Sequence, residues 1–209
     1  MGIPVSLGYV DVICNALGAG LYDPTPDVGC TIIGSTGMHM RLAPDADAVT
    51  LNDEATGYTM PFPVPGHYAQ MQSNMAATLN IDWLLDLARD VLAAEGTTRS
   101  RADLIRRLDE MVLQAKPGEV LFHPFISDAG ERGPFVAHEA CAQFFGLRMH
   151  HRYWDLMRAV IEGLAFAARD CYAAMGALPR DVRITGGAAR ESGPYRDPGA
   201  ALECDVLCL

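Results

Sequence analysis

Apolar and polar residues alternate in several patterns along the chain, and each pattern predicts a different element. Residues 5–9 have apolar side chains at every second position, which is the period of a strand. Residues 11–17, "DVICNAL", then predict a short helix with Asp11 as its N-cap. Gly18 and Gly20 follow as the end of that helix.

Glycines and prolines divide the next part of the chain. Residues 29–43 predict two short apolar strands joined by a tight polar turn at 34–37, "GSTG". Residues 44–65 predict loops and short edge strands, because the three prolines near the end of this stretch are incompatible with a helix.

Helical periodicity dominates the second half. Apolar side chains recur at helical spacing from residue 83 to residue 92, and Gly96 follows as a stop. Ser100, with Asp103 three residues later, predicts a capped second helix. The longest helix is predicted at 152–175, with one apolar face.

Two further strands complete the pattern. Residues 119–125, "EVLFHPF", predict a buried strand, and residues 181–185, "DVRIT", predict a last strand that leads into glycines 186 and 187. Strands, helices and glycine turns in this order are typical of a layered α/β domain. With 209 residues, half of them hydrophobic, and no internal repeat or linker, the chain predicts one domain.

Charge and composition limit the kinds of partner that we expect the protein to bind. A formal net charge of -10 argues against a nucleic-acid or anionic-membrane surface, so a small-molecule substrate fits better. The sequence has no apolar run of about 20 residues, and it does not open with a basic segment followed by an apolar one. We therefore expect neither a membrane helix nor a leader peptide. Its six cysteines lack CxxC spacing, and we interpret them as reduced thiols of a cytoplasmic protein.

Asp11 is the first candidate for chemistry. It lies where a predicted strand ends and a predicted helix begins, and ligands of α/β sheets bind at such points. The positive end of the helix stabilises a carboxylate there, which suits a general base or a ligand of metal-bound water. Asp11 as a simple helix cap explains the same position, and this segment leaves both interpretations open.

Two glycine turns are candidates for nucleotide binding. The turn Gly34, Ser35, Thr36, Gly37 can present N–H groups and hydroxyls to a phosphate, although many such turns only connect a hairpin. The segment 186–188 can hold a nucleotide against bare backbone, although glycine pairs also end strands without ligands. Neither is a P-loop. The histidines have no HExxH spacing, so no metal site is predicted.

A longer stretch carries a resemblance to a known family. Residues 142–162, "AQFFGLRMHHRYWDLMRAVIE", resemble the second signature of the FGGY carbohydrate kinases. Other family motifs occur in the same order along almost the whole chain: Gly8 to Asp11, Gly34 to Gly37, Glu131 to Pro134, and Gly186 to Arg190.

The resemblance implies a fold, a reaction and residue roles. The fold is the C-terminal, ATP-binding domain of the hexokinase/actin-like (ribonuclease H-like) ATPases, and the reaction is phosphoryl transfer from ATP, with Mg²⁺, to a sugar or polyol hydroxyl. Within the family the chain looks most like the erythritol kinase and pentulose kinase members. Asp11 matches the catalytic base. Gly34, Ser35 and Thr36 match the family's hairpin that holds the ATP phosphates. Gly186, Gly187 and Ala188 match the segment against which the adenosine lies.

The chain also departs from the family pattern. The order of Ser35 and Thr36 is reversed, and the tail after about residue 190 has an atypical composition. The sugar-binding N-terminal domain of the family has no counterpart within residues 1–209. We therefore expect residues 1–209 to be an incomplete C-terminal domain, truncated at both ends. The parent protein is then a kinase, which could form homo-oligomers. An inactive fragment with at most weak nucleotide binding is the alternative.

Overall fold

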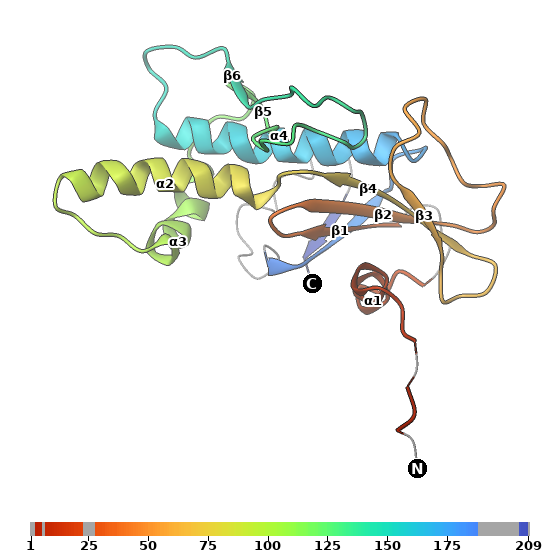
Figure 1. Cartoon of the computed structure of the whole chain (residues 1–209). Helices are drawn as coiled ribbons and strands as arrows, with labels where there is room; N and C mark the ends of the chain where they lie inside the picture. The colour runs from red at the N-terminus through yellow and green to blue at the C-terminus, as the bar shows by residue number, and fades with distance from the viewer. Residues whose placement is uncertain (1–2, 6, 23–27, 188–204, 209) are drawn as a thin grey trace.

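The protein forms one six-stranded sheet with helices on both faces (Figure 1). The computed structural model describes residues 3–5, 7–22, 28–187 and 205–208. The elements in chain order are α1 (Asp11–Gly18), β1 (Val28–Ile33), β2 (Gly37–Ala43), β3 (Tyr58–Pro61), β4 (Tyr68–Asn74), α2 (Thr78–Ala94), α3 (Arg101–Val112), β5 (Leu121–His123), β6 (Gln143–Phe145), α4 (Tyr153–Ala173), β7 (Asp181–Thr185) and β8 (Asp205–Cys208).

The sheet is mixed, with strand order β3-β4-β2-β1-β7-β8. β1 and β2 form the predicted antiparallel hairpin around the turn at 34–36, and β3 is the predicted edge strand. β7 runs parallel to β1 with Thr185 opposite Ile32, and β8 runs parallel to β7. The predicted α/β class is therefore confirmed. The carboxyl ends of the parallel strands β1 and β7 lie next to each other, at the same end of the sheet.

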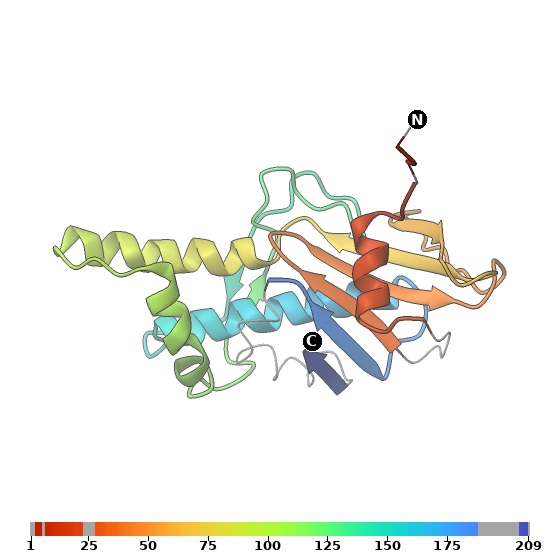
Figure 2. The ribbon, with the colours of Figure 1, turned by 90° about the horizontal axis from the view of Figure 1, so that it is seen from below.

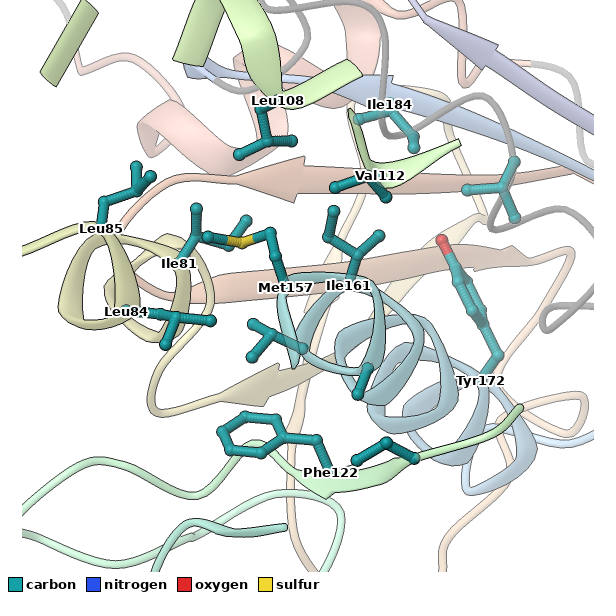
Figure 3. Close-up of a cluster of buried hydrophobic side chains, with 14 of the residues drawn as sticks. Ile81, Leu84, Leu85, Leu108, Val112, Phe122, Met157, Ile161, Tyr172 and Ile184 are labelled. Carbon is teal, nitrogen blue, oxygen red and sulfur yellow. The ribbon is translucent and has the colours of Figure 1, made fainter. Parts of the chain in front are cut away.

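One face of the sheet is covered by α4, with α2 and α3 beside it. In Figure 3 side chains from these helices meet Ile184 of β7 and Phe122 of β5 in one apolar cluster. Met157 and Val160 of α4 are fully buried there, as the predicted inward face of this helix requires. The short β5-β6 pair lies on the outer side of α4, where Phe122 packs on Phe144.

The other face carries α1, which lies across the sheet in Figure 2. Ile13 and Ala16 of this helix are fully buried against Met40 and Cys30 of the sheet. α1 is short because Gly18 is its last residue and Gly20 follows with a φ of 78°, which favours glycine.

The predicted helices occur, with one difference in orientation. The side chain of Ser100 accepts from Asp103 N at 3.1 Å, and its hydroxyl donates to the Asp103 carboxylate at 2.7 Å, so the predicted cap of α3 is confirmed. In α2, however, two side chains of the apolar helical pattern, Leu87 and Val91, are exposed. The half of α2 beyond Leu85 projects past the core, so helical periodicity there does not coincide with burial (Figure 2).

One predicted strand was wrong, one was confirmed only in part, and three strands were not predicted. Residues 7–10 form no strand, and Leu7 is fully exposed, because no neighbouring strand pairs with this segment among the described residues. The predicted strand at 119–125 shrinks to β5 outside the main sheet. The unpredicted strands are β4, which pairs with β2 over all seven of its residues, and the short strands β6 and β8.

Candidate active site

The two predicted nucleotide-binding segments follow the carboxyl ends of the adjacent parallel strands β1 and β7, and they therefore lie at the same end of the sheet. Gly34 follows the last residue of β1, and Gly186 follows the last residue of β7. Gly186 has a φ of 98°, and a Cβ there would lie 2.6 Å from the carbonyl oxygen of Ile33. Only glycine fits this close approach, so the two turns lie against each other.

The turn between β1 and β2 is anchored from behind. Gly34 N donates to Thr36 O at 3.0 Å, which closes the turn. The carbonyl oxygens of Ser35 and Gly34 accept from Ala77 N at 2.7 Å and Thr78 N at 3.0 Å at the start of α2. The side chains of Ser35 and Thr36 remain exposed. The turn therefore keeps its two hydroxyls available to a ligand while its carbonyls are held by α2.

Asp11 is the first residue of α1. The N-cap of this helix is Val10 and not Asp11, so the predicted cap position is wrong by one residue. The Oδ1 atom of Asp11 accepts from Val12 N at 2.9 Å, and the side chain is exposed. A carboxylate in the first turn is stabilised by the positive end of the helix.

Asp11 and the end of β7 share one open hollow of about 360 Å³. It is lined by Asp11, Asn15, Gly18 and Thr185, together with Cys14 and Ala19. The hydroxyl of Thr185 is buried and has no hydrogen-bond partner within the described chain. The hollow thus joins the predicted base to the strand that leads into Gly186 and Gly187, whereas the turn at 34–36 does not line it. Ala188 lies outside the described residues.

A network of buried polar side chains lies behind the turn, and the sequence did not predict it. His39 Nε2 donates to Asn74 Oδ1 at 2.8 Å, so its Nδ1 accepts from the hydroxyl of Thr31 at 3.1 Å. The hydroxyl of Tyr172 in turn donates to that of Thr31 at 2.8 Å. Burial lowers the pKa of His39 to about 4, against the raising effect of the Asn74 bond. The network is therefore neutral, and it ties β1, β2, β4 and α4 together.

One cluster has the composition of a metal site. Glu119, His150 and His151 each offer a ligand atom within 4.8 Å of the others. However, His151 Nδ1 accepts from Arg148 N at 2.9 Å, so Nε2 carries the proton and faces the Glu119 carboxylate at 3.7 Å. A protonated nitrogen cannot ligate a metal, and we assign none to this cluster.

None of the described helices combines the length and the hydrophobicity needed to cross a lipid bilayer. The described cysteines are free thiols, of which Cys14 and Cys141 are exposed and Cys30 and Cys171 are buried.

Comparison with solved structures confirms the fold. A xylulose kinase from Rhodospirillum rubrum superimposes with a TM-score of 0.74 at 24% identity, covering 94% of this chain and 37% of that one. A glycerol kinase from Plasmodium falciparum, solved with ADP, gives a TM-score of 0.72 at 15% identity over 94% of this chain and 37% of its own. The described sheet and helices therefore have the fold of the matching domain in these carbohydrate kinases.

Sequence comparison gives the family. An erythritol kinase from Brucella abortus is 51% identical over 205 residues, which are 98% of this chain and 39% of that protein. A xylulose kinase from Escherichia coli is 28% identical over 90% of this chain and 36% of its own length. The chain thus spans well under half the length of these relatives. Residues 29–206 match the FGGY family of carbohydrate kinases, C-terminal domain, and the chain belongs to this family.

Proposed function

We propose that this chain is the nucleotide-binding part of a cytoplasmic kinase that phosphorylates a hydroxyl of a small polyol, with erythritol as the first candidate and a pentulose as the second. The 51% identity to an erythritol kinase supports the polyol, and the more distant xylulose kinases support the pentulose. Because the chain covers 39% of the erythritol kinase, the proposal concerns the whole enzyme.

One observation carries the nucleotide part of this proposal. The ends of β1 and β7 place two glycine turns against each other, with Asp11 and Thr185 in a hollow beside them. Open backbone at Gly34 and Gly187 suits the close approach of a nucleotide, and the exposed hydroxyls of Ser35 and Thr36 suit its phosphates. We assign Gly34, Ser35 and Thr36 to the phosphates of ATP and Gly186 and Gly187 to the adenosine. The family resemblance assigns Ala188 to the adenosine as well, and this residue lies outside the described part of the chain.

The residues of the chain then have distinct tasks. ATP, when bound with Mg²⁺, supplies the transferable phosphoryl group and part of the charge neutralisation. The turn at 34–36 binds the phosphates and orients them. Asp11 accepts the proton of the attacking hydroxyl at its carboxylate, of which Oδ1 already holds Val12 N. Since phosphoryl transfer depends mostly on positioning and electrostatics, the turn contributes more than the base.

A second candidate is nucleotide binding without transfer. The Asp11 side chain is exposed, whereas phosphoryl transfer requires that water be excluded from the reacting groups. The 209-residue chain by itself would then bind ATP and phosphorylate nothing.

The test is a chimera in which this chain replaces the region of the Brucella erythritol kinase that it matches. We expect erythritol-dependent release of ADP from the chimera, and a kcat lower by about 10² to 10⁴ in its Asp11→Asn variant. Asp53→Asn is the matched control, because Asp53 is exposed and lies in a loop outside the proposed site.

An active chimera whose Asp11→Asn variant keeps its kcat would refute the role of Asp11. A folded chimera that binds ATP and stays inactive would favour the second candidate. Comparison of kcat/KM for erythritol and xylulose in the active chimera separates the two substrate classes.

A further inference from the structure

Glu131 is a buried carboxylate to which the proposed function gives no task. It is 1% exposed, and its carboxylate accepts hydrogen bonds from the N–H groups of Arg132 at 2.9 Å, Met75 at 3.0 Å and Gly133 at 3.4 Å. Within the described chain it forms no ion pair. Burial raises its pKa and these N–H bonds oppose the rise. A buried carboxylate costs stability unless hydrogen bonds compensate for its lost hydration, and here the three N–H groups supply them.

The loop that carries Glu131 is itself fixed. Glu131 and Ala137 exchange two backbone hydrogen bonds, each of 2.9 Å, which close the loop on itself. The carbonyl oxygen of Pro134 accepts from the side-chain amide of Asn52 at 2.9 Å and from the hydroxyl of Thr56 at 2.8 Å. The loop that carries the Glu131 carboxylate is therefore held rigidly in place.

From Met75 a short path leads to the phosphate turn. Met75 is two residues before Ala77, whose N–H donates to Ser35 O, and three before Thr78, whose N–H donates to Gly34 O. Glu131 thus holds one end of a four-residue segment, and the turn at 34–36 is bonded to the other end. A shift of Met75 is carried to the turn through two hydrogen bonds.

A second path reaches the same turn through side chains. The amide of Asn74 donates to Gly133 O at 3.5 Å, and its oxygen accepts from His39 at 2.8 Å. His39 lies two residues after Gly37, where a Cβ would come within 3.1 Å of the imidazole. The loop of Glu131 is therefore linked to both sides of the turn, through β4 and through β2.

We propose that Glu131 is a positioning residue for the nucleotide phosphates, because it fixes the segment 75–78 on which the turn at 34–36 is held. This inference rests on the proposed ATP site. One carboxylate oxygen, Oε1, accepts from the N–H groups of Arg132, Met75 and Gly133, and the other, Oε2, accepts from Met75 N alone at 3.3 Å. Charge-assisted bonds of this kind are strong and short. A glutamine that keeps its oxygen at the Oε1 position loses the charge and turns its NH₂ group toward Met75 N.

The experiment compares Glu131→Gln with Glu162→Gln in the 209-residue chain. Glu162 is the matched control, since it also accepts from a backbone N–H, that of Gly118 at 3.0 Å, but lines a hollow on the outer side of α4. Affinities for ATP and for adenosine are measured by titration. We expect Glu131→Gln to weaken ATP about tenfold and adenosine less than about twofold, because misplacement of the turn affects only the phosphates. Glu162→Gln should change neither.

Each outcome decides between positioning and a structural role alone. Equal weakening of ATP and adenosine, or no weakening, would overturn the proposal, whatever the melting temperature does. If Glu131→Gln does not fold, Glu131→Asp keeps the charge and shortens the side chain, and wild-type affinity for ATP in that variant would overturn the proposal too.

A wild-type chain that does not bind ATP would refute the proposed site in this chain and would leave the positioning testable. The amide resonances of residues 34–37 then provide the measurement. Larger shifts in Glu131→Gln than in Glu162→Gln support positioning of the turn, and equal shifts overturn it.

Discussion

The two faces of the sheet are built for different purposes. The face under α4 is closed by three helices and contains the Thr31, His39 and Asn74 network, fully paired and shielded from water. The face under α1 has a single helix of eight residues (Figure 2). Asp11 of this helix is exposed and lies beside an open hollow. The closed face therefore supplies rigidity, and the open face supplies access to the proposed reacting groups.

Polar groups on the two faces differ accordingly. On the closed face, burial lowers the pKa of His39 to about 4 and raises the pKa of the Cys171 thiol, so both are neutral at neutral pH. On the open face, the guanidinium of Arg183 donates to the carbonyl oxygens of Ala19 and Gly20, at 2.8 and 2.6 Å. A cation at the C-terminal end of α1 stabilises that helix.

The largest effect expected on stability would come from the closed face. Met157 and Ile13 are both fully buried, one on each face. We expect Met157→Ala to lower the free energy of unfolding by about 2–5 kcal/mol, because it leaves a cavity among three helices. Ile13→Ala should instead release α1 locally and speed hydrogen exchange in that helix. Urea denaturation and hydrogen exchange measure the two effects. Equal loss of global stability in both variants would show that the faces form one cooperative unit.

A smaller effect comes from the pH dependence of the closed face. The pKa of His39 is about 4 when folded and about 6.5 when unfolded, so the unfolded chain binds the proton first as pH falls. Stability from the neutral imidazole is present above pH 6.5 and is lost as pH falls toward 4. We expect a loss of about 2 kcal/mol between pH 7 and pH 5, measured by urea denaturation.

The control for this prediction is His39→Gln, which keeps a donor toward Asn74 but does not titrate. Buried Glu131 acts in the opposite direction, since its raised pKa favours proton uptake by the folded state. The difference in pH dependence between wild type and variant therefore isolates His39. Parallel curves for the two proteins would contradict the prediction.

The smallest effect belongs to the edge of the closed face. Ser100→Ala removes the cap of α3 and should lower stability by about 1 kcal/mol. Thr98→Ala is the matched control, since Thr98 is exposed and lies outside the helix. A loss comparable to that of Met157→Ala would show that α3 is as central to the closed face as α4.

Local signals predicted much of this arrangement. The turn at 34–37 between apolar runs, the Ser100 cap and the apolar stripe of the longest helix each depend on residues near in sequence. The family resemblance added the fold, which the comparisons confirm. The roles of Asp11 and of the two glycine turns stay predictions, although the parallel pairing of β1 and β7 places both turns together.

Other features depend on partners distant in sequence. β4 lacks clear alternation because Gln70 and Gln72 are buried, where they bond to Thr50 and Thr56 in a loop some twenty residues earlier. Residues 5–9 do alternate, yet alternation yields a strand only where another strand pairs with it. The side chains of the network around His39 likewise come from three strands and α4, so no short sequence motif predicts it.

The attachment of α2 to the turn at 34–36 also has a mechanical consequence. Two amides at the start of this helix bond to the turn, and its 17 residues extend for about 25 Å, beyond the core at the far end. A rigid rod held at one end multiplies small rotations, so a tilt of about 5° at the turn would move the far end by about 2 Å. The position of the exposed end of α2 therefore depends on the position of the turn at 34–36, which is bonded to the other end of the same helix.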